Sequence, residues 1–242
     1  MVHYRLLQAR TSDDPVRSEE RLAFAQKLGV TTEQVLPFDL LTGDANYARV
    51  TEGVQAVLVG GSGEFGVLDE VGWMPSFLAT MKHLAQHRFP MFASCFGFQA
   101  LSLALGGDVQ TLAERSEVGT YDLTLTPGGQ CDPLFSELPT PFVAQEGHKD
   151  SVIELPPGCT PLASSQRCPH QALRVDGALI YATQFHPELD DLEQRARFSR
   201  YFGLYQTIFG ESRARAILDE MRPSPDANNL LARFHALVSA EV

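Results

Sequence analysis

Short apolar runs alternate with longer amphipathic segments through residues 1–105 of the chain. Runs of the first kind are typical of strands buried on both faces of a parallel sheet, and segments of the second kind are typical of the helices that cover such a sheet. The predicted strands are residues 4–9, 34–40, 55–59 and 89–94, and the predicted helices are residues 18–28, 73–88 and 96–105. This alternation predicts an α/β fold in three layers, with a mostly parallel central sheet between helices.

The second half of the chain has a different pattern. Short strand signals separated by turn residues predict antiparallel strands appended to the parallel sheet, at residues 121–126, 142–145, 151–155, 172–175 and 179–183. From Asp190 onward apolar residues recur at helical spacing, with a break at residues 223–225. These stripes either pack back on the rest of the chain, the interpretation we favour, or form a docking surface for a partner. We therefore expect one domain at residues 1–190 and a helical C-terminal extension packed on it at residues 191–242.

Composition narrows the classes of function. Of the 242 residues, 44% are hydrophobic and 20% are charged, as in ordinary globular proteins. A formal net charge of -11 argues against a nucleic-acid-binding surface, which needs a basic stripe. No apolar run is long enough to cross a bilayer, and the first residues have no signal-peptide pattern. We expect a cytoplasmic protein that binds neither nucleic acid nor membrane.

The cysteines predict neither a disulfide framework nor a metal site. Four cysteines in a chain of this length are too few for a disulfide-rich scaffold. Cys159, Cys168 and His170 fit no tetrahedral zinc spacing, and a fourth ligand is missing. We therefore expect no metal and no cofactor.

Cys95 is the candidate nucleophile. It directly follows the predicted buried strand at residues 89–94 and precedes the predicted helix at residues 96–105. A thiol on such a strand-to-helix turn projects from the end of the sheet at the positive end of a helix dipole, which favours the reactive thiolate. Gly97, two positions later, allows the helix to approach the sheet closely. This context distinguishes Cys95 from an inert core cysteine.

His186 and Glu188 are the candidate partners of this cysteine. They stand two positions apart at the end of the predicted strand at residues 179–183, so both side chains point to the same side. The carboxylate is then placed to hold the imidazole, which acts as general base toward the thiol. Cys95, His186 and Glu188 therefore read as a Cys-His-Glu catalytic triad.

A glycine-rich loop, Gly60–Gly61–Ser62–Gly63, follows the predicted strand at residues 55–59. No Lys-Ser or Lys-Thr pair follows it, which excludes a Walker-type phosphate loop, and its spacing does not match a dinucleotide-binding fingerprint. We interpret it as part of an oxyanion hole, in which the backbone N–H groups of Gly61 and Phe96 point at a tetrahedral oxyanion.

In order and separation, these motifs resemble the class I (triad) glutamine amidotransferase family. The segments that carry the resemblance are residues 57–61, 93–99 and 184–188, together with residues 145–152, which are similar to a Ser-His-x-Asp-x-Val stretch of that family. The resemblance covers roughly residues 1–190. It implies a flavodoxin-like sheet and hydrolysis of a small-molecule γ-glutamyl amide through a thioester on Cys95. It also implies that Gln99 and His148 bind the glutamyl moiety.

Three positions depart from the family pattern. Ala93 and Ser94 stand where a glycine and an aliphatic residue are usual before the nucleophile, and alanine is small enough for the turn. Ser62 replaces a proline after the oxyanion glycines, so this loop is expected to be less preset. After Glu188 only helices are expected, with no synthetase domain.

The resemblance leaves the physiological role open between three alternatives. We favour a stand-alone hydrolase of a γ-glutamyl compound, within the group that resembles the amidotransferase domain of GMP synthase. The second alternative is a glutaminase subunit that feeds ammonia to a separate synthase subunit. The third is a non-catalytic regulatory protein on the same fold, against which the intact triad argues.

Overall fold

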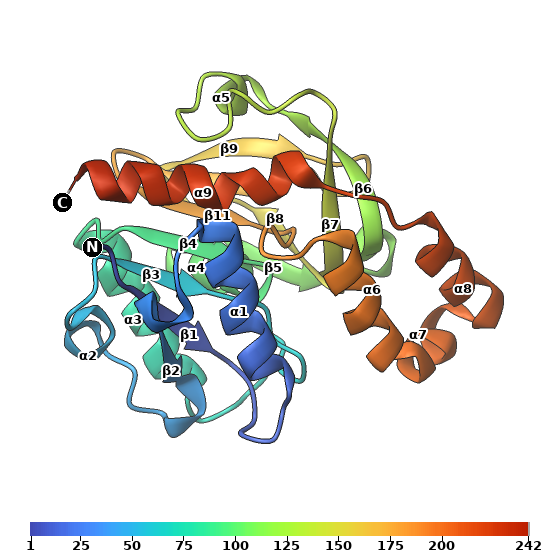
Figure 1. The fold of residues 1–242 in the computed structure, drawn as a ribbon, viewed down its shortest axis with the longest axis horizontal. Coiled ribbons are helices and arrows are strands. Elements are labelled where there is room, and N and C mark those ends of the chain that lie inside the picture. The colour runs from blue at the N-terminus through green and yellow to red at the C-terminus, as the bar shows by residue number, and fades with distance from the viewer. Residues whose placement is uncertain (242) are drawn as a thin grey trace.

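The computed structural model describes residues 1–241 as an α/β fold built around one large mixed sheet (Figure 1). The strands are β1 Tyr4–Gln8, β2 Val35–Asp39, β3 Ala56–Val59, β4 Met91–Ser94, β5 Asp108–Thr111, β6 Glu117–Leu125, β7 Phe142–His148, β8 Asp150–Glu154, β9 Cys159–Ser164, β10 Ala172–Val175 and β11 Ile180–Thr183. The sheet has the order β2-β1-β3-β4-β11-β10-β9-β6-β7, and β5 pairs with β8 in a separate two-stranded ribbon.

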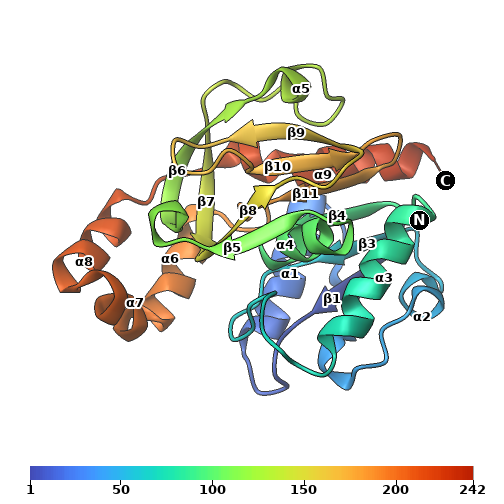
Figure 2. The ribbon, with the colours of Figure 1, turned by 180° about the vertical axis from the view of Figure 1, so that it is seen from behind.

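Helices lie on both faces of this sheet (Figures 1 and 2). The α-helices are α1 Val16–Leu28, α2 Tyr47–Thr51, α3 Met74–Gln86, α4 Phe96–Ala104, α5 Pro127–Gln130, α6 Asp191–Arg200, α7 Phe202–Phe209, α8 Glu211–Glu220 and α9 Pro225–Ala240. In Figure 2, α3 and α4 lie on the face of the sheet opposite α9. The predicted three-layer α/β fold is therefore confirmed.

The parallel half of the sheet forms the buried centre of the molecule. Strands β2, β1, β3, β4 and β11 pair in parallel, and their side chains alternate between the two faces. Leu58 and Phe92 belong to the apolar cluster that includes residues of α1 and α9. Val59 and Ala93 belong to the cluster that includes residues of α3 and α4. Burial on both faces explains why these strands are continuous apolar runs in the sequence.

The direction of strand pairing changes at β11. This strand pairs in parallel with β4 on one side and antiparallel with β10 on the other, and the order continues through antiparallel pairs to β7. Thr183 at the end of β11 pairs in register with Ser94 at the end of β4. The segments that follow these two strands therefore meet at one edge of the sheet.

The C-terminal helices fall into two parts. Helices α6, α7 and α8 lie beside the end of the sheet, at the lower right of Figure 1, and α9 runs back alongside α1. Leu230, Leu231 and Phe234 of α9 are fully buried in the same apolar cluster as residues of β1, β3 and β4. This last stripe thus packs on the sheet, as the favoured interpretation expects. A smaller cluster joins α6 and α8 to Val118 of β6.

Several elements of the structure were not predicted from the sequence pattern. The pattern did not predict α2, β5 or β9, and β6 begins at Glu117 rather than at residue 121. Among residues 1–241, no helix has both the length and the apolar character that a membrane span requires.

Candidate active site

Cys95 lies at the turn between β4 and α4 in a backbone conformation that side chains rarely adopt. Its φ is +49° and its ψ is -101°, so the chain reverses sharply between Ser94 and Phe96. The backbone N–H of Cys95 donates to the carbonyl oxygen of Thr183 at 2.8 Å, which ties the turn to the end of β11. Such strain persists where the surrounding structure fixes it, commonly at functional sites. The turn presents the thiol at the N-terminus of α4, as the sequence predicts.

Gly97 permits α4 to lie directly against the sheet. A Cβ atom at this position would be 2.8 Å from Cβ of Val59 and 3.0 Å from Cβ of Ala93, closer than non-bonded carbon atoms normally approach. The close approach expected of Gly97 is therefore confirmed, and it sets the angle at which α4 leaves the turn.

His186 and Glu188 follow β11, and the pairing of β11 with β4 brings them to Cys95. Nδ1 of His186 lies 2.7 Å from Oε1 of Glu188, and both side chains are buried. Because the carboxylate engages Nδ1, Nε2 is left for the thiol. Burial acts to lower the pKa of His186, but the Glu188 carboxylate and then the nearby Cys95 sulfur raise that pKa to about 10.

Glu188 is held as a carboxylate by its neighbours. Burial acts to raise the pKa of Glu188. The positive charges of His186 and of Arg197 on α6 act to lower it and together outweigh burial, so the pKa lies below its ordinary value. One carboxylate oxygen bonds His186 and the other, Oε2, has no hydrogen-bond partner among residues 1–241. The arrangement suits a carboxylate that orients an imidazolium.

The glycine loop after β3 lies over the imidazole. A Cβ atom at Gly61 would be 2.9 Å from Cε1 of His186, so a side chain there would displace the ring. Ser62 donates through Oγ to the carbonyl oxygen of Ala9 at 3.1 Å and accepts from the backbone N–H of Phe65 at 3.0 Å. These two bonds fix the loop where the family pattern has a proline, so the expectation of a less preset loop finds no support in this geometry.

A buried ion-pair network supports the same loop from below. Arg10 at the end of β1 bonds Asp14 and Glu20, each at 3.1 Å, and Glu20 also accepts from Gln8 at 2.9 Å. A Cβ atom at Gly60 would be 2.4 Å from Oε1 of Glu20, so the first glycine of the loop is required by this carboxylate. None of these polar residues was predicted from the sequence.

Gln99 lies one helical turn after the nucleophile. Its Nε2 donates to the carbonyl oxygen of Asp150 at 2.8 Å and to Oε1 of Gln184 at 3.2 Å, and its side chain is nearly fully buried. These bonds leave Oε1 of Gln99 as an acceptor at the cavity beside Cys95.

Two cavities meet at Cys95. The larger, about 410 Å³, is lined by Phe96, Gln99, the segment 63–66, the segment 147–150 and apolar side chains that include Tyr205 and Phe209 of α7. The smaller, about 140 Å³, is lined by Gly61, His186 and residues of α6 that include Arg197. Cys95 and Tyr205 line both cavities. The thiol therefore stands at the boundary between two spaces with different walls.

Comparison with known proteins identifies the family of this site. The family described as "Glutamine amidotransferase class-I" matches residues 27–204 of the chain. The chain belongs to the class I glutamine amidotransferases. Among curated relatives, a glutamine-hydrolyzing GMP synthase subunit of Thermoplasma acidophilum is 30% identical over 181 residues, which cover 74% of this chain and 82% of that protein. The corresponding subunit of Thermococcus kodakarensis is 34% identical over 124 residues, which cover 51% of this chain and 64% of that protein.

Solved structures share the fold of this amidotransferase. A protein from Thermoplasma acidophilum, described as a GMP synthase subunit, aligns with a TM-score of 0.69 and 19% identity, over 100% of this chain and 96% of that one. A glutamine amidotransferase from Thermotoga maritima aligns with a TM-score of 0.72 and 17% identity, over 99% and 98% of the two chains. The chain spans slightly less than two thirds of the Thermococcus kodakarensis relative.

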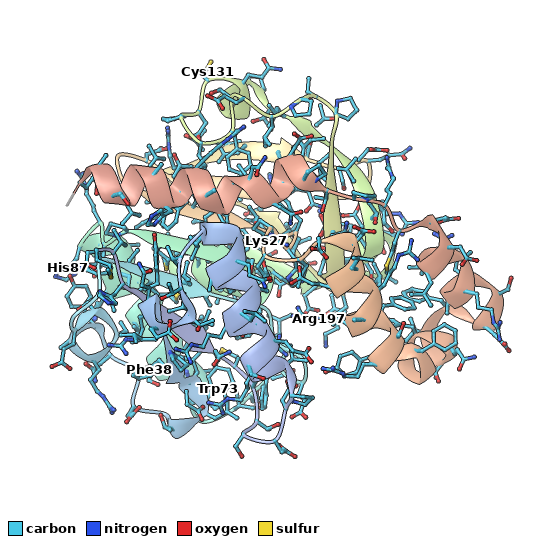
Figure 3. The ribbon with its side chains drawn as sticks, in the orientation of Figure 1. Lys27, Phe38, Trp73, His87, Cys131 and Arg197 are labelled. Carbon is cyan, nitrogen blue, oxygen red and sulfur yellow. The ribbon has the colours of Figure 1, made fainter. Side chains whose placement is uncertain are left out.

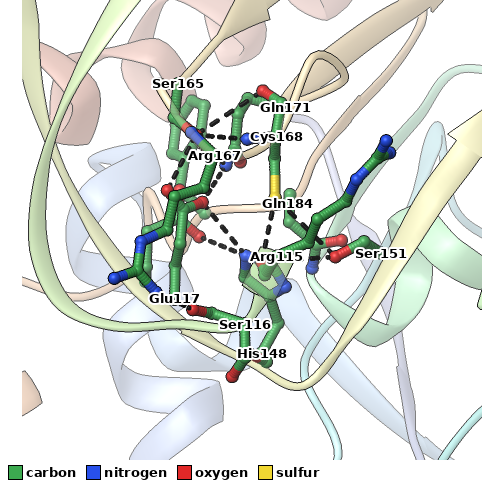
Figure 4. A network of polar contacts seen from close by, with 12 residues as sticks. Arg115, Ser116, Glu117, His148, Ser151, Ser165, Arg167, Cys168, Gln171 and Gln184 are labelled. Carbon is green, nitrogen blue, oxygen red and sulfur yellow. Dashed lines mark hydrogen bonds and ion pairs between the residues drawn. The ribbon is translucent and has the colours of Figure 1, made fainter. Parts of the chain in front are cut away.

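His148 of this amidotransferase lies at the larger cavity, but its imidazole points into the core (Figure 4). Nδ1 lies 2.9 Å from the carbonyl oxygen of Asp150, to which it donates because a carbonyl only accepts. Nε2 faces two buried carboxyl groups, with Oε2 of Glu117 at 3.4 Å and Oε2 of Glu146 at 3.6 Å. The imidazole thus holds the end of β7 against the start of β8.

Glu146 is one of the two buried acids of this network. Neither of its carboxyl oxygens has a hydrogen-bond partner among the described residues. Burial, followed by the nearby Glu117, raises the pKa of Glu146 well above its ordinary value. A neutral acid facing Nε2 of His148 avoids placing two uncompensated carboxylates side by side.

One set of potential metal ligands occurs in the described part of the chain. Atoms of Glu117, His148 and Cys168 lie within 4.8 Å of one another, and all three residues are buried. Glu117 already accepts from Ser165 at 2.7 Å and from Gln171, so its oxygens are engaged by the protein itself. The set differs from the combination of Cys159, Cys168 and His170 that was considered from the sequence.

Proposed function

We propose that this amidotransferase hydrolyses γ-glutamyl amides, with Cys95 as nucleophile, His186 as acid and base, and Glu188 as the residue that orients His186. The observation that carries the proposal is the strained turn at Cys95 beside a buried histidine whose Nδ1 is engaged by a carboxylate at 2.7 Å. This is the relation of nucleophile, base and orienting acid that defines a catalytic triad.

The proposed reaction has two halves. His186 takes the proton of the Cys95 thiol, the sulfur attacks the γ-amide carbon, and the N–H groups of Gly61 and Phe96 stabilise the oxyanion that forms. The first residue of a helix has an N–H without an intrahelical partner, which suits Phe96 to this role. The C–N bond then breaks as His186 gives its proton to the departing nitrogen, and a γ-glutamyl thioester remains. Water, deprotonated by His186, cleaves the thioester to release glutamate and restore the thiol.

The glutamyl moiety is proposed to occupy the larger cavity. Gln99 offers Oε1 there as an acceptor for the α-ammonium group, since its Nε2 is already bonded to the protein. His148 acts on the same cavity indirectly, because its imidazole fixes the carbonyl of Asp150 within the segment that lines the wall.

Glutamate release by the purified chain tests this proposal. Glutamine and a panel of γ-glutamyl dipeptides are supplied to the wild type and to Cys95→Ala, and glutamate is measured enzymatically. Release that requires Cys95 supports the proposal. Equal release by the two proteins rejects a cysteine-dependent hydrolase, and release by neither rejects a hydrolase that acts without a partner.

A second candidate is a glutaminase subunit that supplies ammonia to a separate synthase. It is favoured by the relatives named as glutamine-hydrolyzing subunits of GMP synthase. It predicts that glutamine is the preferred substrate and that glutamate release rises when the synthase partner is added. Preference for a γ-glutamyl dipeptide over glutamine, without such a rise, favours the stand-alone hydrolase.

A further inference from the structure

The two cavities divide the substrate at its scissile bond. His186 lines the smaller cavity, and in the proposed reaction it delivers a proton to the departing nitrogen. The leaving group must therefore extend into the smaller cavity. Gln99 and Phe96 line the larger cavity, where the glutamyl moiety is placed. The smaller cavity is thus the site for whatever is attached to the γ-amide nitrogen.

This space is larger than ammonia requires. Its volume is about 140 Å³, whereas a water-sized molecule needs only about 10–15 Å³ measured in the same way. The cavity therefore has room for a substituent of several heavy atoms on the nitrogen, the size of a small amino acid.

The charges on its wall select the chemistry of that substituent. Arg10 is buried and already engaged by Asp14 and Glu20, each at 3.1 Å. Arg197 has no hydrogen bond or ion pair with any other residue in the range 1–241, although its charge acts on Glu188. Figure 3 shows Arg197 between α6 and α1. The guanidinium on this wall is thus available to an anion.

The neighbouring arginines of α6 are occupied elsewhere. Arg195 donates to the carbonyl oxygens of Leu218 and Met221 at the end of α8. Arg200 pairs with Glu19 of α1 at 2.8 Å. Of the three arginines of this helix, Arg197 is the one that lines the cavity.

We propose that the smaller cavity binds the amino-acid leaving group of a γ-glutamyl dipeptide, and that Arg197 pairs with its α-carboxylate. The inference rests on the proposed function and deepens it. A guanidinium binds a carboxylate through two parallel N–H···O bonds, which fixes both position and orientation. In the reaction the C–N bond breaks, His186 protonates the nitrogen, and the free amino acid departs with its carboxylate still on Arg197. Glutamine carries no substituent on its γ-amide nitrogen, so in this binding mode it places no carboxylate in the smaller cavity.

A matched pair of substrates isolates the carboxylate. γ-Glutamylglycine and γ-glutamylglycinamide differ only in that a carboxylate is replaced by a carboxamide. We expect the wild type to prefer the acid in kcat/KM by about 10- to 100-fold, the range of a charge-assisted hydrogen-bonded pair. Arg197→Gln should reduce this ratio toward one, mainly through KM for the acid. Arg197→Lys keeps the positive charge but cannot donate two parallel N–H···O bonds, so it should retain part of the preference.

Arg200→Gln is the matched control, because Arg200 lies on the same helix and pairs with Glu19 at the surface. It should leave the ratio of the two substrates as in the wild type, and thermal unfolding of each variant verifies that it folds. Cys95-dependent release without preference for the acid overturns the carboxylate site alone. An equal loss on both substrates in Arg197→Gln also overturns it and assigns Arg197 to the support of Glu188. No Cys95-dependent release from any substrate, glutamine included, rejects the proposed function and this inference together.

Discussion

Glu188→Gln removes the charge that holds His186 while preserving the size of the side chain. Glu188 is fully buried, and its Oε1 lies 2.7 Å from Nδ1 of the imidazole. Burial lowers the pKa of His186, and Glu188 is the foremost of the groups that raise it from 6.5 to about 10. Each pKa unit corresponds to about 1.4 kcal/mol. Without the carboxylate, burial remains and the charged imidazole loses most of its support.

The direction of the pH effect follows from the opposing effects of burial and of Glu188 on the pKa of His186. In the wild type the raised pKa of His186, about 10, keeps the imidazole protonated at neutral and mildly alkaline pH. In Glu188→Gln the pKa of His186 falls toward or below its ordinary value, so the imidazolium is lost as pH rises through this lower range. We expect kcat/KM for a γ-glutamyl amide to fall by about 10²- to 10⁴-fold, as in triads that lose their orienting carboxylate.

Two assays separate orientation from loss of the nucleophile. Glutamate release across a pH series gives the pH profile of kcat/KM, and alkylation by iodoacetamide reports without turnover whether Cys95 is still reactive. The variant should still be alkylated, because Cys95 and His186 remain, but the alkaline limb of its kcat/KM profile should move to lower pH. Glu211→Gln is the control, since Glu211 forms an exposed ion pair with Arg215 on α8. An unchanged kcat/KM with an unchanged pH profile in Glu188→Gln refutes the role given to this carboxylate.

Three further substitutions and one deletion test the site and the fold around it. Cys95→Ala should abolish glutamate release while circular dichroism stays as in the wild type, because a small side chain suits the turn; residual release would remove Cys95 from the mechanism. Gly97→Ala should lower the free energy of unfolding by about 1–3 kcal/mol in urea titrations, since its Cβ would lie 2.8 Å from Val59; an unchanged midpoint contradicts the packing argument. Phe234→Ala should lower the free energy of unfolding by about 3–5 kcal/mol, because this α9 side chain is fully buried. Deletion beyond Pro223 should then prevent stable folding, and a folded, active product would show that α9 is dispensable.

The segments that form the reactive centre were predictable because their signals are local. The apolar strand that ends at Cys95 and the short His186–Pro187–Glu188 segment can each be recognised from a few consecutive residues. Their adjacency is a property of the sheet, in which Ser94 pairs in register with Thr183. No pattern within either segment specifies that pairing. The prediction of their proximity therefore came from the complementary chemistry of a thiol, an imidazole and a carboxylate, and the family resemblance supported it.

The weaker predictions failed where the local signal was weak or ambiguous. Helix α2 has only five residues, too few for a periodic pattern to stand out. Strand β9 contains Pro161, which argues against a strand inside a sheet, and its register with β10 is irregular. The family resemblance implied that His148 binds the glutamyl moiety, which stays a prediction; its ring direction depends on the hydrogen bond that Nδ1 donates to the carbonyl oxygen of Asp150. A backbone partner of this kind leaves no trace in residue spacing.

Arg10 and Arg197 were not predicted as parts of the site, because an arginine in the sequence reads first as a surface charge. Tertiary structure gives the two residues opposite properties. Arg10 is buried and neutralised by two carboxylates, whereas Arg197 faces the cavity without a hydrogen bond or ion pair to any other residue in the range 1–241. The distinction depends on which acids are near, and the two acids beside Arg10 come from α1 and from the loop that precedes it.

The walls of the two cavities show how chemistry and selectivity are separated in this chain. The thiol of Cys95, the imidazole of His186 and the backbone of Gly61 are fixed by segments at the edge of the sheet, whose strands are buried on both faces. The outer walls come from α6 and α7, which contact the remainder through the smaller apolar cluster around Phe198 and Val118. Substitutions on the cavity side of these helices therefore change which leaving group fits, at little cost to the central core. Selection for a new γ-glutamyl substrate should accordingly alter α6 and α7 before it alters the strands that hold Cys95 and His186.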